Sequence, residues 1–86
     1  MNHHQNIFKL TKRECECVFL LVRGKTAKEM ADLLLLSKRI IESYIENIKN
    51  KMNCQNKAEL LVKAVSNGYH KQVPIRLNHL AIMKSL

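Results

Sequence analysis

The chain has 86 residues, which is enough for one small domain. Its formal charge is +8, and a charge of this sign favours a polyanionic partner, nucleic acid before a membrane. With only 2 glycines it has no phosphate-cradling loop, and no Ser/His/Asp set lies on a plausible scaffold. We therefore expect a binding protein that is not an enzyme and uses no cofactor.

The amino terminus, MNHHQNIFKL, lacks the apolar core of a signal peptide, and the apolar run Leu33–Leu36 is far too short to span a membrane. The 3 cysteines are an odd number, and Cys15 and Cys17 point to roughly opposite faces if their segment is helical. These features favour a cytoplasmic protein with reduced thiols. His70 and His79 show no ligand spacing with the cysteines, so we expect no metal site.

Residues 1–9 are polar, and we expect a flexible segment there. Thr11 then begins a helix, because T-K-R-E forms a capping box with Glu14 at its third position. The helix is expected to run to about Arg23 and to stop at Gly24. Phe19 falls outside the expected inner stripe and is predicted to be exposed. That stripe consists of Cys17, Val18 and Leu21.

A second capping box, T-A-K-E from Thr26 to Glu29, begins a short helix over about Ala27–Leu34. Ser37 is a good N-cap for a third helix, so only two or three residues separate the two helices. Two short capped helices joined this tightly must cross steeply, which is the geometry of a helix-turn-helix. In that motif the helix after the turn enters the major groove of DNA.

The third helix, about Lys38–Met52, has two contrasting faces. Apolar or aromatic residues recur at helical spacing on one face, at Ile41, Tyr44, Ile45, Ile48 and Met52. Hydrogen-bonding side chains fill the opposite face, at Arg39, Glu42, Ser43, Glu46, Asn47 and Asn50. Such a face suits either solvated surface or the reading of base edges, and the helix-turn-helix context favours the second. The expected base-reading residues are therefore Glu42, Ser43, Glu46, Asn47 and Asn50.

Basic residues surround the motif, and we expect them to contact phosphates, which orient a DNA-binding domain without specifying sequence. Lys25 and Thr26 stand at the start of the second helix, whose N-terminal N–H groups favour an anion. The other basic residues expected at phosphates are Lys28, Lys38, Arg39, Lys49 and Lys51.

Asn56 begins a fourth helix, over about Lys57–Asn67, with Glu59 at its box position. The expected buried stripe is Ala58, Leu61, Ala64 and Val65, which leaves Leu60, Val62 and Ser66 pointing away from it. Four helices in this length make a compact all-α domain. Residues 69–86 are amphipathic, and they form either a fifth helix or a tail without a role.

Residues 10–68 resemble the DNA-binding domain of the LuxR/GerE (NarL-type) family of bacterial transcription regulators. The matching stretches are LTKRECE (Leu10–Glu16), TAKEMA (Thr26–Ala31), IIESYIENIKNKMNC (Ile40–Cys54) and NKAEL (Asn56–Leu60). The resemblance implies a four-helix fold that binds double-stranded DNA sequence-specifically as a homodimer, with the third helix in the major groove. It also implies a dimer contact through the fourth helix, where the expected residues are Leu60, Val62, Lys63 and Ser66.

Several positions depart from the family pattern. Ile40 stands where the family usually has a phosphate-contacting Thr, and Tyr44 stands where His is common, although its hydroxyl can still reach a phosphate. If Glu42 and Glu46 read DNA, they favour C·G pairs, because a carboxylate accepts from the cytosine amino group. Alternatively, they pair with neighbours on the same helix, namely Lys38, Lys49 and Asn50.

A second function stays open on the sequence alone. The chain could use the same fold without reading DNA, as an interaction module that pairs with a full-length regulator and modulates it. Phe19, Leu33 and Leu60, which are apolar and expected to be exposed, support this alternative. The two acidic residues on the polar face of the third helix also support it.

Overall fold

The computed structural model describes residues 6–74 of the chain. In order, these residues form α1 (Lys12–Leu21), α2 (Ala27–Leu34), α3 (Lys38–Lys51), α4 (Lys57–Ser66) and the 3-10 turn η1 (Tyr69–Lys71). The predicted all-α fold is confirmed within this range. The predicted fifth helix falls largely on residues 75–86, which lie outside the described residues.

Each of the four α-helices begins at a residue whose side chain accepts a hydrogen bond from the first turn. The capping boxes at Thr11 and Thr26 are both complete, with hydroxyl and carboxylate each bound to the other residue's backbone N–H. Ser37 and Asn56 cap α3 and α4, so the predicted helix starts are confirmed. α1 ends slightly earlier than predicted, and Gly24 follows it with the left-handed backbone that stops a helix (φ 81°).

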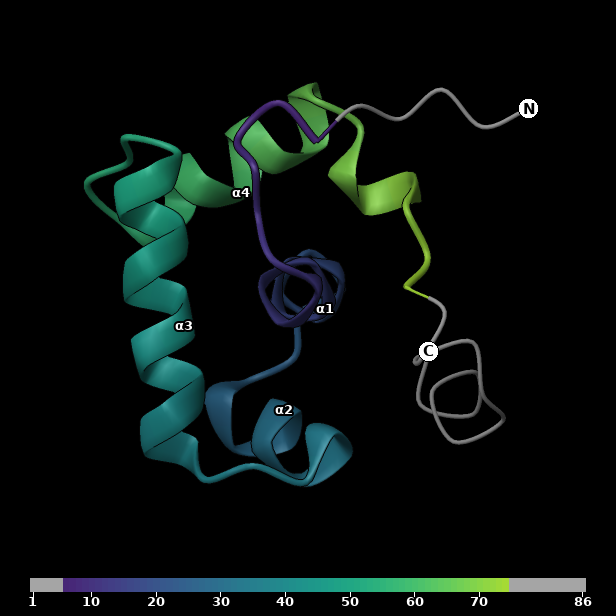
Figure 1. Cartoon of the computed structure of the whole chain (residues 1–86), viewed down its shortest axis with the longest axis vertical. Helices are drawn as coiled ribbons and strands as arrows, with labels where there is room; N and C mark the ends of the chain where they lie inside the picture. Colours follow the sequence, from purple (N-terminus) through teal and green to yellow (C-terminus); the bar gives the residue numbers. More distant parts are fainter. Residues whose placement is uncertain (1–5, 75–86) are drawn as a thin grey trace.

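α1 lies at the centre of the domain, seen end-on in Figure 1, and it contacts α3, α4 and η1. Because neighbours cover it on several sides, the consecutive residues Cys17–Leu21 are all buried. Phe19 is only 2% exposed, so the prediction that it lies on the surface is wrong. The guanidinium of Arg23 lies over its ring, 3.6 Å from the centroid.

α4 is rotated relative to the predicted orientation. Leu60 is fully buried together with Ala64, whereas Ala58 and Val65 of the predicted stripe are exposed. Apolar residues occur on both sides of this helix, so its periodicity fits two phases, and packing against α1 and η1 selects the one with Leu60 inside. The prediction that Leu60 is exposed is therefore wrong. Leu33 was also expected on the surface, and it is half-buried against the core.

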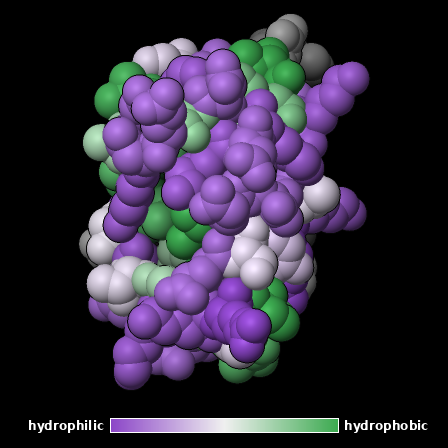
Figure 2. Space-filling model, turned by 90° about the vertical axis from the view of Figure 1, so that its left-hand side faces the viewer, coloured by the Kyte–Doolittle hydropathy of each residue, from purple (hydrophilic) through white to green (hydrophobic). Residues whose placement is uncertain are grey.

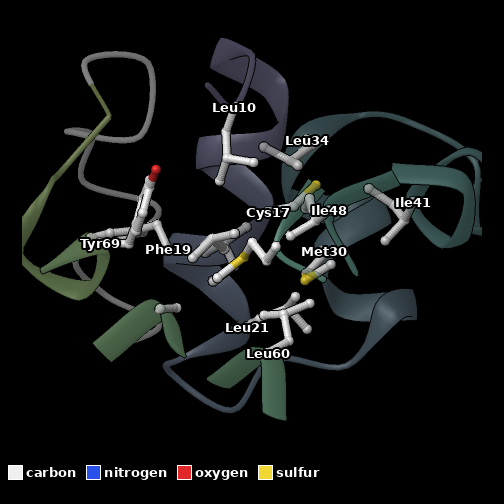
Figure 3. Packing of buried hydrophobic residues seen from close by; sticks show 14 of the residues in the cluster. Leu10, Cys17, Phe19, Leu21, Met30, Leu34, Ile41, Ile48, Leu60 and Tyr69 are labelled. Carbon is white, nitrogen blue, oxygen red and sulfur yellow. The ribbon is translucent and has the colours of Figure 1, made fainter. Parts of the chain in front are cut away.

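Side chains from all four helices and from η1 meet in one core, shown in Figure 3. Tyr69 is part of this core, and its hydroxyl donates to Asn6 Oδ1 (2.6 Å) and accepts from the Phe8 N–H (3.1 Å). Its ring also stacks on Phe8, with the centroids 6.0 Å apart. The packed domain therefore extends from Asn6 past Tyr69.

Candidate nucleic-acid interface

The turn between α2 and α3 sets the direction of α3 relative to α2. Leu35 adopts a left-handed backbone (φ 58°), and the Leu36 N–H donates to the Ala31 carbonyl (2.9 Å), which closes the end of α2. Ser37 then accepts from the Ile40 N–H (3.1 Å) and caps α3. The two helices pack against each other across this short turn, as a helix-turn-helix requires.

One face of α3 is exposed, and we call it the outer face. It consists of Arg39, Glu42, Ser43, Glu46, Asn47 and Asn50, all of which have hydrogen-bonding side chains. On the opposite side Ile41 and Ile48 are buried. Figure 2, seen from the side on which α3 lies, shows a mainly hydrophilic surface. The residues predicted to read bases thus lie together on one exposed surface.

Two lysines form ion pairs with the glutamates of the outer face. Lys38 Nζ lies 3.8 Å from Glu42 Oε2, and Lys49 Nζ lies 3.2 Å from Glu46 Oε1. The sequence left open whether these glutamates read bases or pair on the helix surface, and in the structure both have a lysine partner. Ion pairs at such exposed positions are weak, so the pairing does not prevent either glutamate from changing its partner.

The other residues expected at phosphates lie around the turn and along α3. Lys28 and Arg39 are exposed, and Thr26 is exposed with its hydroxyl bound to the Glu29 N–H. The half-buried members of the expected set are Lys25, Tyr44 and Lys49. The start of α2 therefore presents basic side chains, whereas its Thr26 and Glu29 N–H groups are already bound within the capping box.

Lys51 differs from the other lysines of α3, because its ammonium is bound to α1. Its Nζ lies 2.7 Å from Glu14 Oε1 and 3.3 Å from the Lys9 carbonyl oxygen. Burial raises the pKa of Glu14, but the Lys51 ammonium and the Thr11 N–H outweigh burial and hold that pKa below its ordinary value. The end of α3 is thus fastened to the start of α1. Sequence reasoning treated Glu14 only as a capping residue and missed this pair.

The residues of α4 predicted to contact a second copy have different surroundings. Val62 is 65% exposed, and Ser66 is exposed as well. Lys63 is half-buried, and its ammonium donates to two carbonyls just after α3, at 2.8 and 3.1 Å. Leu60 is buried, so it offers nothing to a partner. Val65, which sequence reasoning placed in the core, is 48% exposed and enlarges the apolar surface of this helix.

The cysteines of the structure are free thiols, at Cys15, Cys17 and Cys54. Burial raises the pKa of the Cys17 thiol to about 12, so this thiol stays protonated at neutral pH and behaves as a core side chain. Among residues 6–74, no three His, Cys, Asp or Glu side chains are grouped in a way that could hold a metal ion. In the same part of the chain, none of the helices is long and apolar enough to cross a bilayer.

Known proteins share this arrangement. Residues 8–64 match the model of the GerE family, described as bacterial regulatory proteins of the luxR family. The quorum sensing-dependent transcriptional regulator VjbR of Brucella abortus is 36% identical over 59 residues, which cover 69% of this chain and 23% of VjbR.

Two solved structures are also similar. The VqmA protein of a phage, in complex with DPO, is 47% identical with a TM-score of 0.79, over 84% of this chain and 33% of that chain. The VqmA dimer of Vibrio cholerae is described as a LuxR-type receptor that binds DNA. It is 31% identical with a TM-score of 0.79, and the match covers 81% of this chain and 31% of the VqmA chain. The chain thus spans between 23% and 33% of the length of these proteins.

Proposed function

The chain belongs to the luxR family of bacterial regulatory proteins, and we propose that it regulates transcription by binding a specific site in double-stranded DNA. The family and the relatives are transcription regulators and not enzymes, in agreement with the expectation from the sequence. The observation that carries the proposal is the outer face of α3. It is exposed, it bears hydrogen-bonding side chains throughout, and it lies on the helix that follows the turn.

In the proposed complex, α3 enters the major groove with its outer face against the base edges. Glu42 and Glu46 accept hydrogen bonds from cytosine N4, and Ser43, Asn47 and Asn50 offer both donors and acceptors. The proposed phosphate contacts are Lys25, Thr26, Lys28, Lys38, Arg39, Tyr44 and Lys49. Lys51 is left out of this set, because its ammonium is bound to Glu14.

We further propose that two copies bind a two-fold symmetric site and touch through α4. Val62 and Val65 expose apolar area on this helix, and Ser66 is exposed on it as well. The dimer described for VqmA of Vibrio cholerae supports this assembly. Because the exposed apolar area is small, we expect the dimer to be weak in solution and to form on DNA.

Selection from random duplexes at near-physiological salt tests the proposal. The wild type is compared with Glu42→Ala, Glu46→Ala, and with Asp32→Ala as a control that removes an exposed carboxylate from α2. We expect the wild type and the control to enrich an inverted repeat with C·G pairs that the double variant no longer selects. Weak binding that is indifferent to sequence and collapses as salt rises would refute specific reading.

The alternative function, an interaction module that pairs with a full-length regulator without reading DNA, has lost most of its support. Phe19 and Leu60 are buried and Leu33 is half-buried, so these three residues supply little of the exposed apolar surface that the alternative needs. Replacing both Lys25 and Lys49 by Met separates the two functions. This change should abolish DNA binding, and it would leave a contact with a partner protein intact.

A further inference from the structure

The charge on the outer side of α3 is nearly balanced, although the whole chain carries +8. Lys51 is bound to Glu14 of α1. The other charged residues of α3 are Lys38, Arg39 and Lys49 against Glu42 and Glu46, a net charge of +1. Since phosphates surround any helix in the major groove, a balanced helix gives up much of the attraction that holds a protein on DNA of any sequence.

The residues of the two ion pairs lie along one edge of α3. Lys38 pairs with Glu42 four positions on, and Glu46 pairs with Lys49 three positions on. At about 100° per residue, these four positions fall within about 80° of the helix circumference. Each carboxylate therefore shares one edge of the helix with the ammonium group that it neutralises.

We infer that Glu42 and Glu46 act as a specificity gate, which withholds Lys38 and Lys49 from phosphates until cytosine amino groups replace the two lysines. This inference rests on the proposed DNA binding and adds a mechanism of discrimination to it. At a matching site the amino groups satisfy both carboxylates, so both ammonium groups become available to phosphates. At other sites the carboxylates keep their lysines, because a carboxylate without a partner would face phosphates unpaired.

The pairs are weak enough to exchange partners. The side chains of Lys38 and Glu42 are 64% and 58% exposed, and that of Glu46 is 63% exposed. Ion pairs at such positions contribute little and are screened by salt. The side chain of Lys49 is 24% exposed, so its aliphatic stem is packed along the protein while its ammonium lies at the surface beside Glu46. Because the pairs are weak, cytosine amino groups can replace the lysines at a matching site at little cost. The gate therefore lowers affinity for mixed sequences more than affinity for a matching site.

The salt dependence of binding to mixed-sequence duplex DNA tests the gate, because the slope of log Kobs against log salt counts the phosphates that are neutralised. Glu42→Gln, Glu46→Gln is expected to bind this DNA roughly tenfold more tightly at low salt, with a slope steeper by up to about 1.8, since two lysines become available. The Lys38→Met, Lys49→Met variant serves as a second background. Adding Glu42→Gln, Glu46→Gln to it should leave its slope unchanged, since no lysine is left to become available. Asp32→Asn is the matched control, and we expect the wild-type slope for it.

An unchanged slope in the glutamine variant overturns the gate. Equal steepening in the methionine background also overturns it, since the carboxylates would then act by repulsion alone. If the wild type and the glutamine variant both fail to bind any duplex at low salt, the proposed DNA binding fails and the gate fails with it. If the protein does bind DNA and the glutamine variant has the wild-type slope, the gate is refuted and the proposed DNA binding still stands. Thermal unfolding of each variant verifies that the fold is kept.

Discussion

Replacing Lys51 by Met is expected to destabilise the domain and to leave the proposed phosphate contacts unchanged. The Lys51 ammonium lies 2.7 Å from Glu14 Oε1, and the two side chains are 36% and 4% exposed. Met keeps most of the aliphatic stem but removes the charged partner of a buried carboxylate. Breaking a buried pair costs about 3–5 kcal/mol and an exposed pair about 0–1 kcal/mol, so we expect a loss of about 1–2 kcal/mol for this partly exposed pair.

Thermal unfolding followed by circular dichroism measures this loss. For a domain of this size, it corresponds to a fall in Tm of about 4–16 °C at neutral pH. The pKa of Glu14 is lowered in the folded state, so its contribution is complete above the ordinary value of 4.5 and is lost as the pH falls through the lower folded value. The difference in Tm between wild type and Lys51→Met should therefore vanish in acid. Lys28→Met, which removes an exposed lysine from α2, is the control and should melt like the wild type.

Two results would refute this reasoning. One is an equal Tm for wild type and Lys51→Met at neutral pH, and the other is a difference that persists unchanged in acid. The DNA assay gives an independent check, because loss of a phosphate contact lowers the salt slope by about one unit. Lys51→Met should keep the wild-type slope. A slope lowered by one unit would mean that Lys51 contacts a phosphate after all.

Three further changes test the packing of the domain by urea unfolding. Tyr69→Phe removes the hydroxyl that joins Asn6 and the Phe8 N–H, and it should cost about 1–2 kcal/mol, whereas an unchanged midpoint would mean that these bonds are not formed. Leu35→Gly relieves a left-handed backbone at a residue that is 89% exposed, and it should raise stability by up to about 1 kcal/mol; a clear loss would show that the leucine side chain contributes to the fold. Leu60→Ala should cost about 2–5 kcal/mol, and a loss below about 0.5 kcal/mol would return this residue to the surface.

The helix starts could be predicted because each depends on residues close together in the chain. Thr11, Thr26, Ser37 and Asn56 each receive a hydrogen bond from the N–H three residues on, so the sequence alone contains both partners. The exposed face of α3 could be predicted for a similar reason, since Ile41 and Ile48 mark its buried side clearly.

The buried faces of α1 and α4 could not be predicted in the same way. A single inner stripe assumes that a helix is covered on one side, and α1 is covered on several, so Phe19 is buried as well. In α4 the apolar residues allow two phases, and only the neighbouring helices decide that Leu60 faces inward. The contacts of Tyr69 with Asn6 and of Lys51 with Glu14 join residues 63 and 37 positions apart, and no local pattern marks them.

Lys49 and Lys51 show why the number of lysines on a proposed recognition helix does not measure its attraction for DNA. The two residues lie about 200° apart around α3. Lys49 therefore meets Glu46 on the outer side, whereas Lys51 reaches Glu14 on α1. The charge of +8 overstates what α3 itself offers to phosphates. If this helix reads DNA, its discrimination must come from the fit of its outer-face side chains, Glu42 and Glu46 among them, to base edges. The ratio of specific to mixed-sequence binding at physiological salt then reports its function better than affinity at low salt.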